Sequence, residues 1–316
     1  MSVTRQVNLR EVGPRDGLQS CKSRMSTADK LAWIRGEAAA GMPEIEICSF
    51  VPAKYLPMFA DAAEVVAAAK AIPGLIPTVL VPNAQGAVRA LEVQAPKINL
   101  VVSVSEGHNQ SNVRRSRAES MAAFREIAQK VKAASYKPKL ALSLATSFGC
   151  TIDGPTPEDE VLRMAKEALA CGIDELVIAD SVGYANPTQV RRVMGRVLGE
   201  AGRNVTVALH LHDTRGLALA NALAGFEAGV RMFDASLGGI GGCPYAPGAT
   251  GNVAMEDLVF MFESMGVATG VHLPALLRVR ELVQMALPEE TLVGSIARAD
   301  LPKGWHPATP RPRAAA

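Results

Sequence analysis

The sequence predicts an α/β fold, a (β/α)8 TIM barrel with a short C-terminal helical extension. Three observations lead to this prediction. Short apolar runs alternate with longer amphipathic ones, eight such pairs follow one another, and the 316 residues are enough for one barrel. A doubly wound open sheet is the alternative. It usually carries a GxGxxG phosphate turn after its first strand, whereas the turn at residues 13–17 has the sequence GPRDG.

The individual elements follow from hydrophobic periodicity along the chain. Short apolar runs predict strands at residues 6–12, 44–48, 76–80, 97–104, 139–145, 175–180, 205–212 and 232–237. Amphipathic patterns between them predict helices at residues 27–40, 60–71, 84–94, 116–133, 156–170, 187–200, 216–228 and 252–264, with one more at 272–287. We expect residues 1–271 to form the barrel and residues 272–316 a helix and an irregular tail that packs on the barrel or trails from it.

Capping residues support several helix boundaries. Thr156 precedes Pro157, and Asn186 precedes Pro187, which is the pattern of an N-cap followed by a proline in the first helical position. Glycines that end helices as C-caps are expected at three positions: Gly41, Gly172 and Gly229.

Composition narrows the class of protein. The formal net charge is +2 with both signs spread along the chain, so nothing indicates a nucleic-acid partner. Five cysteines without a CxxC motif argue against a disulfide framework and favour a reducing compartment. No signal peptide, transit peptide or membrane-spanning run is recognisable, so we expect a cytoplasmic protein that does not enter a membrane.

The run ALHLHDT at residues 208–214 is the most informative motif. In a strand, residues two apart point to the same side, so His210 and His212 should leave the strand together while Asp213 faces the other way. Two parallel imidazoles beside an acid suit a divalent metal. An exposed histidine pair, or two core histidines bonded to backbone, is the alternative.

Further polar residues stand at or near the carboxyl ends of other predicted strands, where barrel active sites lie. Arg15 and Asp16 follow the first strand, Glu46 lies within the second, Asp180 ends the sixth, and Cys243 lies in the glycine-rich loop after the eighth. Each also has a structural reading. Arg15 and Asp16 could form a turn ion pair, and Glu46 could face solvent on an edge strand, although a barrel has no edges. Asp180 could be a helix N-cap, and Cys243 a small inert residue.

The candidate ligands mix oxygen and nitrogen donors. Asp16, His210 and His212, with Asn252 as an amide-oxygen donor, suit Mg²⁺ or Mn²⁺ better than a structural zinc site. His108 and Asn112, after the fourth strand, could line the site or cap their loop.

These motifs resemble those of the 3-hydroxy-3-methylglutaryl-CoA lyase family, within the wider group of metal-dependent TIM-barrel lyases and Claisen-type synthases. The resemblance runs from about Val7 to about Val271. Five segments carry it: EVGPRDGLQ at 11–19, SFVP at 49–52, HLHDT at 210–214, GGIGGCPY at 238–245, and GN at 251–252 ahead of EDLV at 256–259.

The resemblance implies residues and roles. The implied metal ligands are Asp16, His210, His212 and Asn252, and the implied catalytic residues are Arg15, Glu46, His210 and Cys243. We also expect substrate contacts from Gln19, Asn112, Asp180 and Ser181. The resemblance also implies an acyl-CoA substrate, and the C-terminal helices could support a homodimer.

The implied reaction is a retro-Claisen cleavage of a 3-hydroxy-3-methylacyl-CoA, with acetyl-CoA and acetoacetate as products when the substrate is hydroxymethylglutaryl-CoA. A divalent metal would activate the alcohol, His210 or Glu46 would take its proton, Arg15 would hold the enolate oxygen, and Cys243 would protonate the enolate carbon. This reaction belongs to leucine degradation and ketone-body formation.

Several positions depart from the family pattern. The segment IADS at 178–181 replaces the usual LGDT, Arg215 replaces a tyrosine, His108 replaces an aromatic residue, and Ala145 and Thr146 replace a Ser-Cys pair. A citramalyl-CoA lyase, or a lyase for a longer 3-hydroxy-3-alkylglutaryl-CoA, is therefore an alternative. A Claisen-type synthase and a non-catalytic metal-binding barrel remain further alternatives.

Overall fold

The computed structural model describes residues 6–242 and 251–309, and it forms a closed barrel. Eight parallel strands pair in chain order, and the eighth pairs back with the first. They are β1 (Asn8–Glu11), β2 (Glu44–Ser49), β3 (Ile76–Leu80), β4 (Lys97–Ser103), β5 (Lys139–Ala145), β6 (Glu175–Asp180), β7 (Thr206–Leu211) and β8 (Met232–Ala235). The predicted TIM barrel is confirmed, and three strands have the predicted bounds: 76–80, 139–145 and 175–180.

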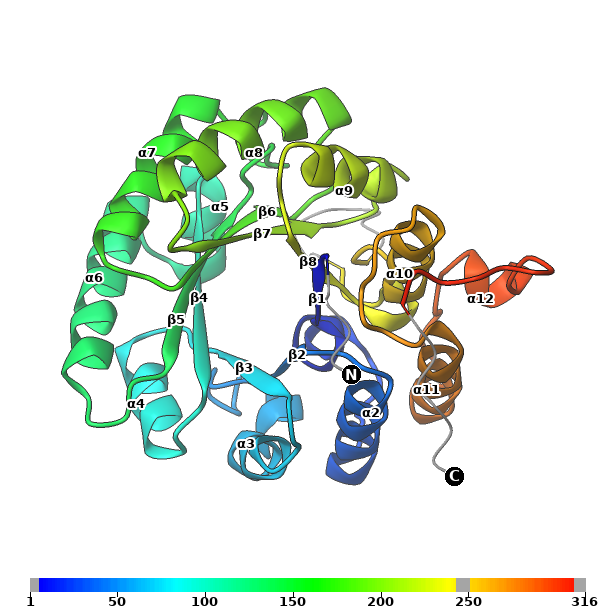
Figure 1. Cartoon of the computed structure of the whole chain (residues 1–316). Coiled ribbons are helices and arrows are strands. Elements are labelled where there is room, and N and C mark those ends of the chain that lie inside the picture. Colours follow the sequence, from blue (N-terminus) through cyan, green and yellow to red (C-terminus); the bar gives the residue numbers. More distant parts are fainter. Residues whose placement is uncertain (1–5, 243–250, 310–316) are drawn as a thin grey trace.

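Helices surround the strands in Figure 1. The helices of the outer ring are α2 (Thr27–Ala39), α3 (Ala62–Lys70), α4 (Ala84–Glu92), α6 (Arg117–Ala133), α7 (Glu158–Ala170), α8 (Pro187–Ala201), α9 (Ala218–Glu227) and α10 (Met255–Ser264). Shorter pieces lie in the connections: η1 (Gly13–Gly17), α1 (Leu18–Ser20), η2 (Pro57–Phe59), α5 (Glu106–Val113) and η3 (Leu237–Gly239). No described helix is long and apolar enough to cross a membrane.

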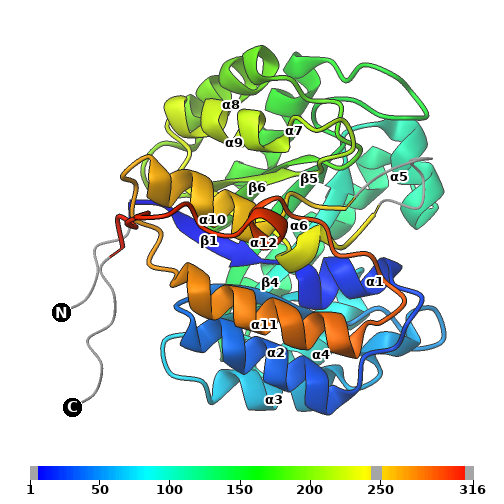
Figure 2. The same ribbon diagram turned by 90° about the vertical axis from the view of Figure 1, so that its right-hand side faces the viewer.

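The C-terminal extension packs against the barrel. Helix α11 (Leu273–Ala286) lies beside α2 in both views, and α12 (Ile296–Ala299) lies near α10 (Figures 1 and 2). The segment beyond α12 also makes specific contacts: the Trp305 indole donates to the Ser264 hydroxyl at 2.9 Å, and the Thr309 backbone N–H donates to Glu263 at 2.6 Å.

Two kinds of core hold the barrel together. A large apolar cluster, with Trp33, Phe124 and Phe233 among its largest fully buried members, fills the space between strands and helices. Inside the strand ring lies a buried ion layer of Arg10, Glu44, Lys97, Glu175 and Asp234.

Some predicted boundaries were wrong, for local reasons. The segment after β4, expected as a loop, forms α5 (Glu106–Val113), because the Ser105 hydroxyl accepts from the His108 backbone N–H at 3.0 Å and caps the helix. Thr156 is not an N-cap, since its hydroxyl donates to the Thr146 carbonyl and the helix begins at Glu158. Asn186 does cap α8, as predicted.

Candidate active site

The turn η1 brings Arg15 and Asp16 over the end of the barrel. The backbone N–H groups of Arg15 and Asp16 donate to the Val12 carbonyl at 3.1 and 2.7 Å, which folds the chain into a single π-helical turn directly after β1. Because this turn follows β1 directly, the Arg15 and Asp16 side chains lie at the carboxyl end of the strand, where barrel active sites lie.

Arg15 forms the centre of a buried charged group. Its Nε donates to Glu46 Oε2 at 2.6 Å, and one terminal nitrogen donates to Asp16 Oδ1 at 2.7 Å. Glu46 also accepts from Asn99 Nδ2 at 3.0 Å. The turn ion pair considered from sequence does exist, but Glu46 of β2 is an additional partner of the guanidinium. Arg15 is only 8% exposed, so its charge acts in a site that excludes most water.

Three potential ligand groups converge beside Arg15. One ligand atom each from Asp16, His210 and His212 lies within 4.8 Å of the others. The two imidazole rings lie 5.2 Å apart between centroids, and both side chains are buried, so the alternative of an exposed histidine pair is wrong. Burial raises the pKa of Asp16, but the charges of Arg15 and the two histidines outweigh this effect and lower the pKa to about 2. The carboxylate therefore stays ionised and able to bind a cation.

Asn252 joins these groups from a distant part of the chain. The predicted helix at 252–264 begins only at Met255, because Asn252 pairs with His212 in a β-bridge and the Val253 N–H donates to the Leu211 carbonyl. The Asn252 Nδ2 donates to Asp16 Oδ2 at 2.8 Å and to the Ile240 carbonyl at 3.1 Å.

The second polar atom of the Asn252 amide, Oδ1, indicates whether a metal fits this site. This oxygen is buried and accepts a hydrogen bond from no described residue. An unsatisfied buried oxygen is costly unless a ligand completes it. A carboxylate, two imidazoles and an amide oxygen form the mixed donor set of a hydrated divalent cation, so the residues present fit such an ion.

The ion layer inside the barrel reaches the site through His210. Asp234 Oδ2 pairs with His210 Nδ1 at 3.1 Å and accepts from Arg10 at 2.9 Å. Although burial alone would raise it, Arg10 and His210 lower the pKa of Asp234 to about 2. Burial disfavours a charged imidazole, but Asp234 raises the pKa of His210 above its ordinary value. A carboxylate behind a ligating histidine fixes its tautomer and ring orientation.

Asp234 and Arg10 were missed in the sequence. A charged residue inside an apolar strand run was the available signal, and it was used only for Glu46. Arg10 in β1 and Asp234 in β8 show the same pattern.

The expected substrate-contacting residues occupy varied positions. Gln19 is half-buried on α1, and Asn112 is exposed on α5. Asp180 is buried and accepts from the backbone N–H groups of Tyr184 and Ala185 at 2.8 and 3.0 Å, and burial raises its pKa to about 6. It therefore orders the β6–α8 loop and does not cap the helix. The Ser181 hydroxyl accepts from the Thr146 N–H at 3.1 Å.

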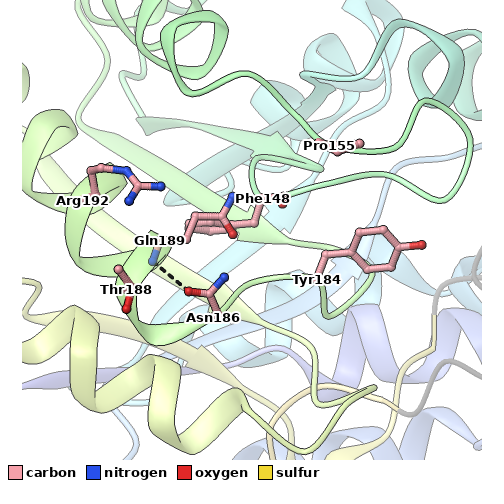
Figure 3. Close-up of a pocket in the computed structure, with 7 residues that line it drawn as sticks. All are labelled: Phe148, Pro155, Tyr184, Asn186, Thr188, Gln189 and Arg192. Atoms are coloured by element: carbon pink, nitrogen blue, oxygen red, sulfur yellow. Dashed lines mark hydrogen bonds between the residues drawn. The ribbon is translucent and has the colours of Figure 1, made fainter.

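A cavity of about 520 Å³ opens beside these loops (Figure 3). It is lined by Phe148, Pro155, Tyr184, Asn186, Thr188, Gln189 and Arg192. Arg215 stacks on the Tyr184 ring at 4.3 Å and donates to the carbonyls of Val182 and Gly183. None of the lining residues is a candidate metal ligand. Cys243 lies outside the described residues.

Fold and site together define a TIM-barrel protein with a candidate divalent-metal site at the carboxyl ends of its strands. The HMGL-like family model matches residues 6–283. Hydroxymethylglutaryl-CoA lyase of Bacillus subtilis is 39% identical, over 90% of this chain and 94% of the relative, and (R)-citramalyl-CoA lyase of Chloroflexus aurantiacus is 37% identical, over 91% and 94%.

A solved structure supports the same assignment. The HMG-CoA lyase of Acinetobacter baumannii, in complex with coenzyme A and 3-methylmalate, superposes with a TM-score of 0.88 at 38% identity and covers 97% of this chain and 99% of that one. The chain belongs to the HMGL-like family, and its relatives at 36–39% identity include carbon–carbon lyases.

Proposed function

We propose that this protein cleaves 3-hydroxy-3-methylglutaryl-CoA to acetyl-CoA and acetoacetate. One observation carries the proposal: ligand atoms of Asp16, His210 and His212 lie within 4.8 Å of one another beside the buried Arg15 guanidinium, and the side chain of Asn252, whose Oδ1 is unsatisfied, donates to Asp16. A metal binder alone has no need for an adjacent buried cation, whereas a reaction that develops an enolate does.

We propose that Asp16, His210, His212 and Asn252 hold Mg²⁺ or Mn²⁺. When bound, such an ion supplies a Lewis acid that lowers the pKa of the tertiary alcohol and orients the substrate. The half-buried Asp16 carboxylate and the Asp234-bound His210 ring are already oriented, so little rearrangement is needed on binding.

Arg15 is the residue we assign to the thioester oxygen. Cleavage of the bond between C2 and C3 leaves the electron pair on the acetyl-CoA fragment, where the carbonyl oxygen gains negative charge. The Arg15 guanidinium is permanently charged and is held by Glu46 and Asp16, so it can stabilise that oxygen without reorganising. A contact of this kind contributes about 3–4 kcal/mol to the transition state.

Glu46 and His210 are the two candidate acceptors of the alcohol proton. The His210 ring already uses Nδ1 toward Asp234, and if its second nitrogen holds the metal it has no lone pair left for a proton. Glu46 carries further lone pairs on a carboxylate already held by Arg15 and Asn99, so we favour Glu46 as the acceptor. Cys243 remains our proposed donor to the enolate carbon.

Gln19, Asn112, Asp180 and Ser181 stay proposed as substrate contacts. For Asp180 we favour an indirect contribution, because its carboxylate orders the loop that carries Tyr184. A cytoplasmic location and a role in leucine degradation or ketone-body formation are likewise proposals, and a homodimer stays a prediction.

The alternative substrate is citramalyl-CoA. Identity to a citramalyl-CoA lyase is nearly as high as identity to hydroxymethylglutaryl-CoA lyases. In addition, Arg215, on the β7–α9 loop, replaces the tyrosine of the family pattern.

Product analysis decides between them. The purified protein with Mg²⁺ should convert hydroxymethylglutaryl-CoA to acetyl-CoA and acetoacetate, identified by mass spectrometry, and should convert citramalyl-CoA far more slowly. Faster formation of pyruvate would favour the alternative, and cleavage of neither thioester would reject the proposal. Arg15→Gln serves as the matched control for background hydrolysis.

A further inference from the structure

A second, buried pair of carboxyl groups lies behind the site. Glu11 ends β1 and Glu37 lies in α2, and both side chains are fully buried at 0% exposure. The mechanism above uses neither residue. Two buried acids in contact need an explanation, because an unpaired buried charge is very costly.

Glu11 connects two turns of the active-site rim. Its Oε1 accepts from the Gly13 N–H at 2.6 Å, and its two oxygens accept from the Leu237 N–H at 3.1 and 3.0 Å. Gly13 begins the turn η1, which carries Arg15 and Asp16. Leu237 begins η3, which leads to Gly241 beside Asn252.

Glu37 approaches Glu11 from α2. Its Oε1 accepts from the Trp33 indole N–H at 2.8 Å. Its Oε2 is buried with no N–H or O–H of a described residue directed at it, while the carboxyl group is within hydrogen-bonding reach of Glu11. Two carboxyl groups can share a hydrogen bond only when one of them carries a proton.

The hydrogen bonds that the two carboxyl groups already accept indicate which of them carries the proton. Glu11 Oε1 accepts the Gly13 N–H, and the Leu237 N–H is shared by both Glu11 oxygens, so we assign the negative charge to Glu11. Glu37 Oε2 has no other partner among the described residues, so it is the O–H donor.

The surroundings favour a retained proton. Among the described residues neither acid forms a salt bridge, and the neighbouring Glu256 adds negative charge. The nearby cation Arg280 is bonded to Glu256 at 2.8 Å, and Glu256 also accepts from the Gly238 N–H. Burial raises the pKa of Glu37 to about 8. Burial also raises the pKa of Glu11, but the backbone N–H groups of Gly13 and Leu237 lower it.

We propose that Glu37 is a positioning residue that keeps one proton at neutral pH and, by donating it to the Glu11 carboxylate, fixes the two turns that carry Arg15, Asp16 and the segment beside Asn252. The catalytic part of this inference rests on the proposed lyase function. The proton itself does not, and it can be measured independently.

The proton has a predictable effect on stability. The pKa of Glu37 rises from the ordinary value of 4.5 in the unfolded chain to about 8 in the folded protein. Between these values the folded state binds one more proton, so raising the pH through this window destabilises the fold, and the unfolding constant grows by about tenfold per pH unit from this group. The contribution levels off above the folded pKa.

Three variants separate the possibilities. Glu37→Gln keeps a donor for Glu11 and an acceptor for Trp33 but cannot titrate. Glu37→Leu removes the donor and leaves the Glu11 charge uncompensated. Glu64→Gln, an exposed acid on α3, makes the same chemical change without touching the site.

Urea unfolding from pH 5 to pH 9, infrared spectroscopy of the protonated carboxyl band, Mn²⁺ titration and steady-state kinetics are measured for all. In Glu37→Gln, the slope of the unfolding free energy against pH should decrease by the equivalent of about one proton. The variant should also lose a carboxyl infrared band that Glu64→Gln retains. Its Mn²⁺ affinity and kcat/KM should stay within about threefold of the wild type. Glu37→Leu should lower both by tenfold or more, a change larger than 1.4 kcal/mol.

The proposal fails if Glu37→Gln retains the pH slope and the infrared band of the wild type, or if it loses Mn²⁺ affinity as severely as Glu37→Leu. Should the wild type cleave no acyl-CoA at all, the proposed function fails, while the unfolding and infrared measurements still decide whether the proton is present.

Discussion

The contact between Asp234 and His210 gives the most direct test of how the site is held. In Asp234→Asn one acceptor oxygen replaces two. The wild-type carboxylate serves Arg10 through Oδ1 and Oδ2, each at 2.9 Å, and His210 through Oδ2 at 3.1 Å. The amide cannot satisfy both, so the His210 ring loses either its bond or its orientation.

The expected magnitude follows from the role of such partners. Loss of the group that orients a ligating histidine weakens metal binding by about 10- to 100-fold, which corresponds to about 1.4–2.8 kcal/mol. The charge change also matters, because Asp234 raises the pKa of His210 and metal binding requires the neutral ring. Without the Asp234 carboxylate, protons compete less with the metal for His210, and near neutral pH this partly offsets the loss of metal affinity.

The assay is therefore run at pH 8, where proton competition is small. Isothermal titration calorimetry with Mn²⁺ measures the Kd of wild type and Asp234→Asn. Glu175→Gln is the matched control, since Glu175 belongs to the same ion layer and bonds Arg10 and Lys97 but not His210. Thermal melting in the absence of metal checks that both variants fold.

Two results would refute the reasoning. A Kd for Asp234→Asn within twofold of the wild type would mean that the carboxylate does not position His210. An equal weakening in Glu175→Gln would mean that the net charge of the layer matters and the specific contact does not.

Four further outcomes are expected. Arg15→Gln should lower kcat by at least about a hundredfold, and near-normal turnover of the purified variant would contradict its assignment. Asn252→Ala removes the unsatisfied Oδ1 and should weaken Mn²⁺ binding by about tenfold or more by calorimetry, and unchanged affinity would exclude it as a ligand. Dialysis against EDTA should abolish activity and Mg²⁺ or Mn²⁺ should restore it, so full activity in a verified metal-free sample would remove the metal from the mechanism. Phe262→Ala should lower the free energy of unfolding by about 3–5 kcal/mol in urea unfolding. The reason is that this fully buried ring packs on the rings of Phe233 and Phe226, at centroid distances of 5.1 and 5.6 Å. A loss below about 1 kcal/mol would show that neighbouring side chains refill the space.

Predictions from sequence succeeded where the signal was local. The pattern at 139–145 predicts β5 with its observed bounds, and the Asn186-Pro187 pair predicts the start of α8. They were wrong where a tertiary contact determined the local structure. Asn252 lies in a predicted helix but is extended, because it pairs with His212, and no periodicity can reveal a bridge between two distant segments.

The same division holds for the site. Strand alternation places His210 and His212 on one side, and barrel topology brings them to the rim that also carries Arg15 and Asp16. The partners behind these groups could not be predicted in this way. The charge of Asp234 within an apolar strand run could have indicated a buried ion, but not that its partner is Arg10, which lies 224 positions away in the chain.

By itself the sequence determined the order of strands and helices, the closed barrel, the family motifs and the residue types available for a metal. Only the tertiary structure decided which buried charges neutralise one another: Asp234 with Arg10 and His210, and Glu46 with Arg15. The physical reason is that hydrogen bonds and ion pairs depend on distances of about 3 Å. Such distances are set by strand register, barrel closure and helix packing, and not by the spacing of residues along the chain.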